Sequence, residues 1–143
     1  MALYDHRTQV EVIDRRECLV LLAAEVVGRL GVLDGGSPLV LPMNYALHDE
    51  EIVFQTGPGT KLDAANGHPA CFEIDAFDRD EHSGWSVVVR GRLEEVTRFD
   101  PVALAALEHR AQPWMSAPRP NVLRLVPSSI TGRRIRAAPN VAP

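Results

Sequence analysis

The sequence lacks an apolar run long enough to cross a membrane, although 45% of its 143 residues are hydrophobic. Its longest apolar stretches, such as residues 18–24 and 39–43, are far shorter than the roughly 20 residues that span a bilayer. The N-terminus carries acidic residues where a secretion signal would be basic and then apolar. These absences predict a cytoplasmic protein without a membrane partner.

Positive charge is also scarce. The formal net charge is −4 and the pI is about 5.7, whereas nucleic-acid-binding proteins are typically basic over a broad surface. Fourteen of the fifteen basic residues are Arg, and Lys61 is the only lysine. We therefore expect no nucleic-acid partner, and we ask what surrounds the single lysine.

Motifs for metal binding and nucleophilic catalysis are absent too. The five histidines have no HxxxH or HExxH spacing, and the two cysteines have no CxxC spacing. The sequence contains no GxSxG, no P-loop and no GxGxxG after a strand. We expect no metal site, assign no catalytic residue, and interpret Cys18 and Cys71 as small buried side chains.

The first periodic segment predicts a helix that begins after Asp14. Asp14 is a favourable N-cap residue, and Glu17 three positions later completes a capping-box pattern. Apolar residues follow at helical spacing, and Gly28 is a plausible helix end. We expect residues 1–13 to form an N-terminal arm that packs on the domain or on a partner, and residues 137–143 to form a flexible tail.

After Gly28 the hydrophobic period changes to that of β-strands. Residues 29–34 end in the hairpin turn sequence Asp34-Gly35-Gly36, and alternation over 39–47 predicts the next strand, with a bulge or a sheet edge at Pro42. Further strands are predicted over 51–56, 70–76, 85–97 with a bulge at Gly91, 121–126 and 129–136, with short helices over 61–66 and 100–110. The pattern predicts a mostly β domain over residues 14–136, built as a small antiparallel barrel with short α-helices.

The segment Thr56-Gly57-Pro58-Gly59-Thr60-Lys61 stands out because a strand ends there and a helix begins. Helix N-termini present unpaired N–H groups and the positive end of a dipole, which favour a phosphate. The Thr60 hydroxyl and the Lys61 ammonium would add a donor and a full charge. Spacing alone is explained at least as well by an ordinary strand–turn–helix connection, with Thr60 as N-cap and Lys61 solvated.

Four motifs in order resemble those of the pyridoxamine 5′-phosphate oxidase-like flavoproteins, and more closely the small bacterial flavin-nucleotide-binding branch of that family. They are VGRLGV at 27–32, PLVLPMNY at 38–45, IVFQT at 52–56 with GTKL at 59–62, and GWSVVVRG at 84–91. Each motif is weak alone, but the resemblance runs from about residue 14 to 136. It implies a split β-barrel of the FMN-binding type, which forms a homodimer and holds FMN in two clefts at the dimer interface.

The resemblance also implies a set of cofactor-binding residues. The strand over 41–45 offers backbone groups and the Asn44 amide to the isoalloxazine edge, while a second group holds the ribityl phosphate and a third lines the cleft from the other subunit. Arg29 is either a second phosphate cation or a surface charge. The residues implied at the isoalloxazine edge are Leu41, Pro42, Met43 and Asn44. Those implied at the phosphate are Thr56, Thr60, Lys61 and the adjacent Leu62, and those implied to line the cleft from the other subunit are Trp85 and Ser86.

Two departures from the true oxidases argue against vitamin B6 oxidation. The stretch from Thr56 to Lys61 is one residue shorter than theirs, with Thr60-Lys61 in place of Ser-Arg-Lys, and ITGRR at 130–134 stands where they carry a substrate-recognising Trp and Arg. The function expected is that of a flavin-dependent oxidoreductase acting on a small organic substrate or a nicotinamide. A deazaflavin-dependent reductase and a non-enzymatic flavin or haem carrier or sensor are the alternatives.

Overall fold

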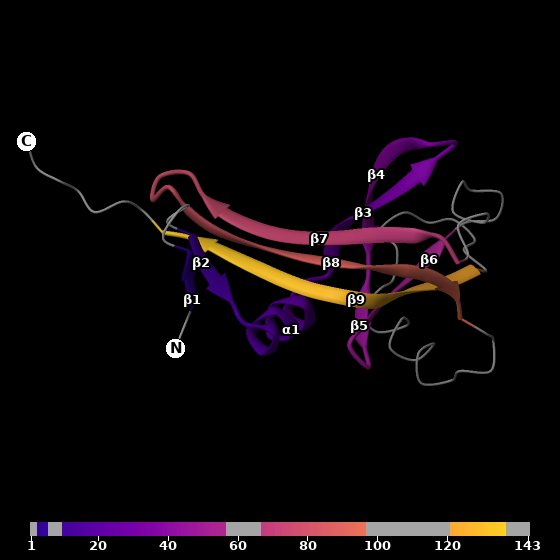
Figure 1. The fold of residues 1–143 in the computed structure, drawn as a ribbon, viewed down its shortest axis with the longest axis horizontal. Helices are drawn as coiled ribbons and strands as arrows, with labels where there is room; N and C mark the ends of the chain where they lie inside the picture. The colour runs from indigo at the N-terminus through magenta and orange to yellow at the C-terminus, as the bar shows by residue number, and fades with distance from the viewer. Residues whose placement is uncertain (1–2, 6–9, 57–66, 97–120, 137–143) are drawn as a thin grey trace, which may run out of the picture.

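The computed structural model describes residues 3–5, 10–56, 67–96 and 121–136. In these ranges the chain forms one α-helix and a nine-stranded antiparallel sheet with the order β1-β2-β9-β8-β7-β3-β4, to which β6 is joined through β9 and β5 through β6. Figure 1 shows the elements, whose bounds are α1 Arg15–Ala24, β1 Leu3–Asp5, β2 Val10–Ile13, β3 Val27–Asp34, β4 Ser37–Asn44, β5 Ala46–His48, β6 Glu51–Thr56, β7 Pro69–Asp78, β8 Ser83–Glu95 and β9 Asn121–Ile135.

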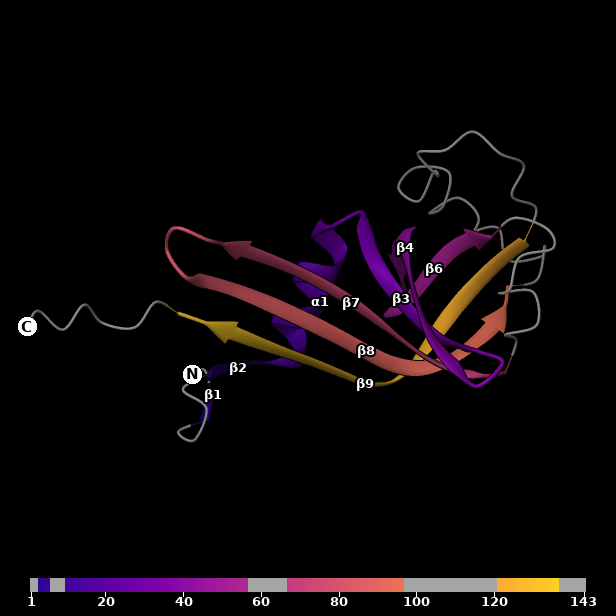
Figure 2. The same cartoon turned by 90° about the horizontal axis from the view of Figure 1, so that it is seen from above.

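The sheet curls because β9 has two different neighbours along one of its sides. Its first residues pair with β6 and its last with β2, while β8 pairs along its other side. Figures 1 and 2 show β7, β8 and β9 as long curved strands side by side, with α1 beside them. The prediction of a mostly β, antiparallel, barrel-like fold is confirmed.

The helix begins where the sequence predicts. The Asp14 carboxylate accepts a hydrogen bond from the Glu17 backbone N–H at 2.8 Å, which confirms the N-cap. The Glu17 side chain bonds to the guanidinium of Arg134 and so joins the start of α1 to β9. Arg134 also contacts Glu11 of β2 at 3.3 Å, so one partly buried guanidinium joins β9 to α1 and β2.

The predicted end of the helix is wrong. Helix α1 ends at Ala24, four residues before Gly28, because residues from Val27 onward pair with β4. Gly28 is instead a buried residue of β3, where a Cβ would collide with the ring of Phe72. This glycine allows β3 and β7 to pack closely and does not act as a helix stop.

The predicted β3–β4 hairpin is confirmed. Asp34 pairs with Ser37, so the turn contains only Gly35 and Gly36, whose φ angles of +57° and +84° suit the primed turns of tight hairpins. Strand β4 is the last strand of the order, which agrees with the edge position expected from Pro42. The predicted strand over 39–47 is interrupted after Asn44, because β5 leaves β4 and pairs with β6.

The register shift predicted at Gly91 is present, although the extra residue lies on the partner strand. Pairing shifts between Arg90 and Gly91, which leaves Ser128 of β9 with no residue opposite it. The Ser128 hydroxyl donates a hydrogen bond to the Arg90 carbonyl at 3.1 Å. The two closing strands predicted over 121–126 and 129–136 are therefore one strand, which continues through the bulge.

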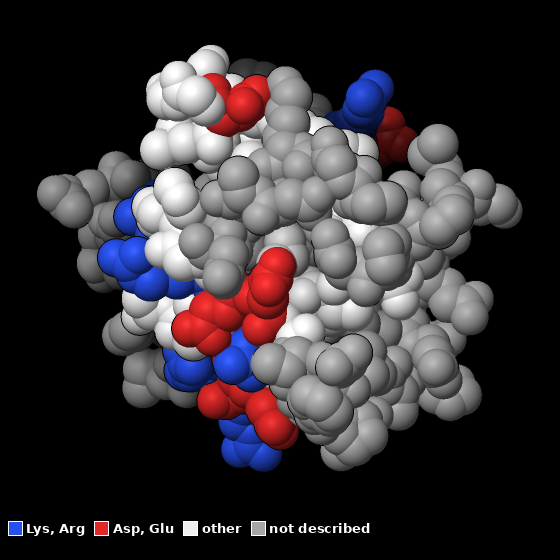
Figure 3. Space-filling model, turned by 90° about the vertical axis from the view of Figure 1, so that its right-hand side faces the viewer, with Lys and Arg blue, Asp and Glu red and all other residues white. Residues whose placement is uncertain are grey.

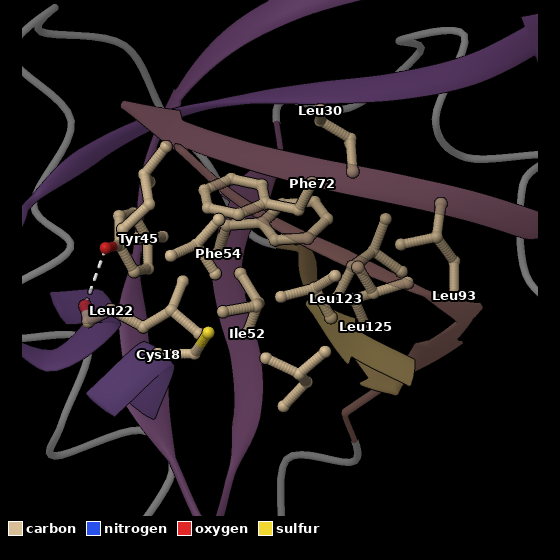
Figure 4. Packing of buried hydrophobic residues seen from close by; sticks show 14 of the residues in the cluster. Cys18, Leu22, Leu30, Tyr45, Ile52, Phe54, Phe72, Leu93, Leu123 and Leu125 are labelled. Carbon is tan, nitrogen blue, oxygen red and sulfur yellow. Dashed lines mark hydrogen bonds between the residues drawn. The ribbon is translucent and has the colours of Figure 1, made fainter. Parts of the chain in front are cut away.

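The hydrophobic core lies between the inner face of the sheet and α1. Figure 4 shows the ring of Tyr45 beside Phe72, and the two centroids are 4.8 Å apart in an edge-to-face arrangement. The Tyr45 hydroxyl donates to the carbonyl of Leu22 at 2.6 Å. The buried cluster comprises Ile13, Cys18, Leu22, Leu30, Val32, Tyr45, Ile52, Phe54, Phe72, Ile74, Val87, Val89, Leu93, Leu123, Leu125 and Ile130.

Tyr45→Phe is expected to lower the free energy of unfolding by about 1–2 kcal/mol. The substitution removes the buried hydroxyl that donates a hydrogen bond to the Leu22 carbonyl. The ring contact with Phe72 is retained, so packing contributes little to the loss. Urea unfolding measures the change. A variant as stable as the wild type would show that the hydrogen bond contributes nothing net.

The predicted helices over 61–66 and 100–110 and the tail over 137–143 lie outside the described residues. Part of the predicted arm forms β1 and β2, and β2 pairs with β9. No helix in the described ranges is long and apolar enough to cross a membrane.

Candidate functional site

The side of the sheet that faces away from the core, here called the outer face, brings together several of the predicted cofactor residues. The strand register places Pro42 opposite Arg29, Arg29 opposite Glu73, and Ser86 opposite Asp75. Alternate residues of a strand point to opposite faces, and the neighbours of these residues are buried in the core. The side chains therefore share the outer face of β3, β4, β7 and β8.

The predicted residues of β4 divide between the two faces. Asn44 follows Pro42 by two positions and lies on the outer face, whereas Leu41 and Met43 are partly buried and pack against the core. A ligand on the outer face could meet Leu41 and Met43 only through their backbone. Strand β4 has β3 as its only partner among the described strands, so one row of its N–H and C=O groups is available for such contacts.

Thr56 is buried on the core side of β6, because it follows the core residues Ile52 and Phe54 at strand spacing. It ends β6, is 1% exposed, and its Oγ1 has no hydrogen-bond partner within the described residues. A buried hydroxyl left in this state costs about 1–3 kcal/mol, which is a reason to look for a ligand there. The residues that follow it in the predicted phosphate motif, Thr60, Lys61 and Leu62, lie outside the part of the chain that the structure describes.

Trp85 and Ser86 are consecutive on β8 and point to opposite faces of the sheet. Trp85 is partly buried and packs against the core cluster, while Ser86 lies on the outer face opposite Asp75. Both line a small pocket of about 150 Å³. Its other walls are Val10, Phe77, Arg133 and Ile135.

Two acidic residues that the sequence patterns did not single out lie at the centre of the outer face. Glu73 and Asp75 lie two positions apart on β7, and both reach the guanidinium of Arg29, at 3.4 Å and 3.5 Å. Burial raises the pKa of Glu73 to about 7, with help from the hydrogen bond to Asp75 and its charge, and Arg29 opposes this rise. The signal was present, because these acids alternate with Phe72 and Ile74 in a segment interpreted only as a buried strand.

Arg29 therefore has two carboxyl partners on the protein itself. A phosphate that bound Arg29 would compete with Glu73 and Asp75 for the same guanidinium. The choice between a phosphate cation and a surface charge stays a prediction.

A groove of about 580 Å³ lies on the outer face beside the β3–β4 hairpin. Leu33 and Val40 line one side and Cys71 and Arg90 the other. Cys71 is exposed, so the prediction that both cysteines are buried is wrong for this one. The reason is the strand period, which turns Phe72 into the core and Cys71 outward, opposite Arg90.

Large apolar side chains are exposed at both ends of the outer face. Val40 and Leu33 are 66% and 60% exposed beside the groove, and Phe77 is 61% exposed at the opposite end of β7. Val12 and Ile135 add to the apolar surface near Phe77. Exposed apolar surface of this extent is typical of an interface.

Charges elsewhere on the surface are of mixed sign. Figure 3 looks at the end of the molecule that lies on the right in Figure 1 and shows acidic and basic side chains next to each other. Arg124 illustrates the pattern, since it bridges Glu51 of β6 at 3.4 Å and Glu94 of β8 at 3.0 Å. Among the described residues, no three His, Cys, Asp or Glu side chains gather as a metal site.

Comparisons with known proteins agree with the motifs and the fold. A model of the pyridoxamine 5′-phosphate oxidase family matches residues 14–134. An uncharacterised protein of Mycobacterium tuberculosis is 30% identical over 135 residues, which cover 90% of this chain and 88% of that protein.

Two solved structures with the same architecture are FAD-binding proteins. The one from Mycobacterium smegmatis is 31% identical with a TM-score of 0.71, and the match covers 87% of this chain and 99% of that one. The one from Mesorhizobium loti is 26% identical with a TM-score of 0.72, covering 88% and 98%. The chain folds as a split β-barrel of the flavin-binding type and belongs to the pyridoxamine 5′-phosphate oxidase family.

Proposed function

We propose that this protein is a homodimeric flavin-nucleotide-binding oxidoreductase that holds the FMN phosphate at the end of β6 and the ring along the neighbouring edge of β4. The observation that carries the proposal is the buried Thr56 hydroxyl, which lacks a partner among the described residues and directly precedes the Gly-Pro-Gly-Thr-Lys motif. The FAD-binding neighbours support it, because FAD contains the riboflavin 5′-phosphate unit of FMN.

Each part of the cofactor has a matching group in the chain. Thr56 offers a buried hydroxyl, and Thr60 and Lys61 would add a donor and a positive charge to the phosphate. The unpaired edge of β4 offers backbone donors and acceptors to the ring, with Asn44 beside it. Ser86 would contact the ring from the second subunit.

The second subunit is proposed because the outer face is too apolar to remain in water. An isologous dimer would place this face against the same face of its partner and cover Leu33, Val40 and Phe77, each at least 60% exposed in the single chain. The cleft between the two copies would then have walls from both.

The flavin would supply the hydride or electron transfer. The residues of this chain would orient the ring and exclude water, and none of them is assigned as an acid–base catalyst of the transfer. The groove of about 580 Å³ beside Cys71 has the volume of a small-molecule site. It suits the small organic substrate or nicotinamide that we propose.

Adding FMN to stripped protein is expected to raise Tm, and riboflavin is expected to raise it much less. A ligand at a hundredfold excess over its Kd stabilises the native state by about 2.7 kcal/mol, equivalent to roughly 6–10 °C for a chain of this length. Riboflavin lacks the phosphate that Thr56 and Lys61 would bind. Differential scanning fluorimetry measures both shifts.

Equal shifts from FMN and riboflavin would contradict phosphate recognition, and no shift from either would contradict flavin binding. A separate assay, with dissolved oxygen or an added dye as the electron acceptor, distinguishes an enzyme from a carrier. The flavin-loaded protein should oxidise a nicotinamide or another small reductant repeatedly as the acceptor reoxidises the flavin, whereas a carrier would bind the flavin without turnover.

A further inference from the structure

The cluster of Arg29, Glu73 and Asp75 has an unbalanced charge. Two carboxyl groups share one guanidinium through contacts of 3.4 and 3.5 Å, so the ionised cluster carries a net charge of −1. The side chains of Glu73 and Asp75 are only 32% and 21% exposed. Further burial of this charge would be costly unless the cluster gained a cation or a proton.

Among the described residues, the outer face around the cluster is mostly uncharged in the rows that contain Glu73 and Asp75. Val88 and Ser86 of β8 lie opposite Glu73 and Asp75, and Pro42 of β4 lies opposite Arg29. The next charged or titratable groups on the outer face lie one row away: Cys71 beside Glu73 on β7, Arg90 opposite Cys71, and Arg133 of β9 opposite Ser86. Within the described residues, Arg29 is the only cation paired with these carboxyls.

The cluster also lies between the two apolar ends of the outer face. Leu33 and Val40 lie at one end of it and Phe77 at the other. In a two-fold dimer whose axis passes through the cluster, the Leu33–Val40 end of each outer face would lie on the Phe77 end of its partner. The two clusters would then meet at the axis. Two like charges of −1 would then face each other in a buried contact.

We propose that the outer face takes up one proton per chain, shared by Glu73 and Asp75, when a second copy covers it, so that self-association tightens as the pH falls. The inference rests on the proposed homodimer. With one proton the two carboxyls and Arg29 sum to zero, and each Arg29 can also face the carboxyl pair of the other copy. The two deprotonated clusters repel each other, so the same contact weakens in alkaline solution.

The pH range follows from the raised pKa of Glu73. A carboxyl that titrates near 7 in the single chain is mostly protonated below neutrality. Dimer formation at low pH is therefore accompanied by the uptake of few additional protons. Above neutrality the free chain has lost the proton and the covered chain retains it. The association constant should therefore fall with rising pH above about 7, by up to about a hundredfold per pH unit, because the dimer retains two protons that the two free chains have lost.

Sedimentation equilibrium of the full apoprotein between pH 5.5 and 9 tests the inference. Wild-type association should weaken above neutrality, whereas Glu73→Gln, which is neutral at every pH and similar in size, should give a flat profile and tighter association than the wild type at pH 8.5. Glu25→Gln is the matched control, because Glu25 follows α1 and lies off the outer face. A Val40→Ala background, applied to all three proteins, brings a very tight dimer into the measurable range.

Identical pH profiles for the wild type and Glu73→Gln would overturn the inference, and so would a dimer whose association does not change with pH. Either result leaves the proposed homodimer and its flavin site intact. A chain that stays monomeric at every pH overturns both the inference and the dimer, while the FMN and riboflavin comparison still decides flavin binding.

Discussion

Lys61→Ala is expected to weaken FMN binding by roughly tenfold to a hundredfold. A charge-assisted contact to phosphate is worth about 1.5–3 kcal/mol, and each 1.4 kcal/mol corresponds to a tenfold change in Kd. Lys61 is the only lysine of the chain and follows a Gly-Pro-Gly sequence. It stands five residues after Thr56, whose hydroxyl is buried.

Isothermal titration calorimetry with FMN measures this loss, and Lys61→Arg is the matched control. Arginine keeps the charge but changes the geometry of its donors, so it should recover part of the affinity. The Tm of each apoprotein checks that folding is unchanged. If Lys61→Ala binds FMN as well as the wild type, the phosphate lies elsewhere. Arg29 would then be the next candidate, despite its pairing with Glu73 and Asp75.

Gly91→Ala is expected to destabilise the fold by about 3 kcal/mol, the upper part of the range for inserting atoms into a packed site. A Cβ at this position would overlap the carbonyl oxygen of Val126. That atom belongs to the backbone of β9 beside the bulge at Ser128, so it cannot move aside as a side chain would. Thermal unfolding should show a Tm lower by roughly 6–12 °C.

Gly31→Ala is the control for this variant. The added Cβ would lie 2.7 Å from the sulfur of Cys71, and an exposed thiol can rotate away at small cost. We expect a change of about 1 kcal/mol or less, because alanine also limits the unfolded chain. Equal stability of the two variants would contradict the close contact between Gly91 of β8 and the backbone of β9 at the bulge.

The features predicted correctly from the sequence depend on short-range chemistry. Asp14 caps the helix through a contact only three residues away. Gly35 and Gly36 form the hairpin turn because glycine adopts positive φ at little cost. The order of the motifs predicted the family for the same reason, since each motif is a local segment and the family model matches them along the chain.

The predictions that failed required knowledge of the neighbouring strand. The local pattern predicts a helix end at Gly28, but this glycine permits the approach of Phe72 from β7. The two closing strands were separated at 126–129, but pairing with β8 continues on both sides of Ser128. A local pattern contains no information about which residue lies across the sheet.

The division between sequence and tertiary structure is clearest at the candidate site. The residue types that suit a phosphate stand together in one segment after Thr56, so the sequence is sufficient to single them out. Arg29 and Glu73 are 44 residues apart along the chain, and only the antiparallel register of β3 and β7 makes them neighbours. The exposure of Cys71 and the sharing of Arg29 by two carboxyls follow from that register. Both depend on which face the core occupies, and the packing of the whole sheet against α1 decides that face.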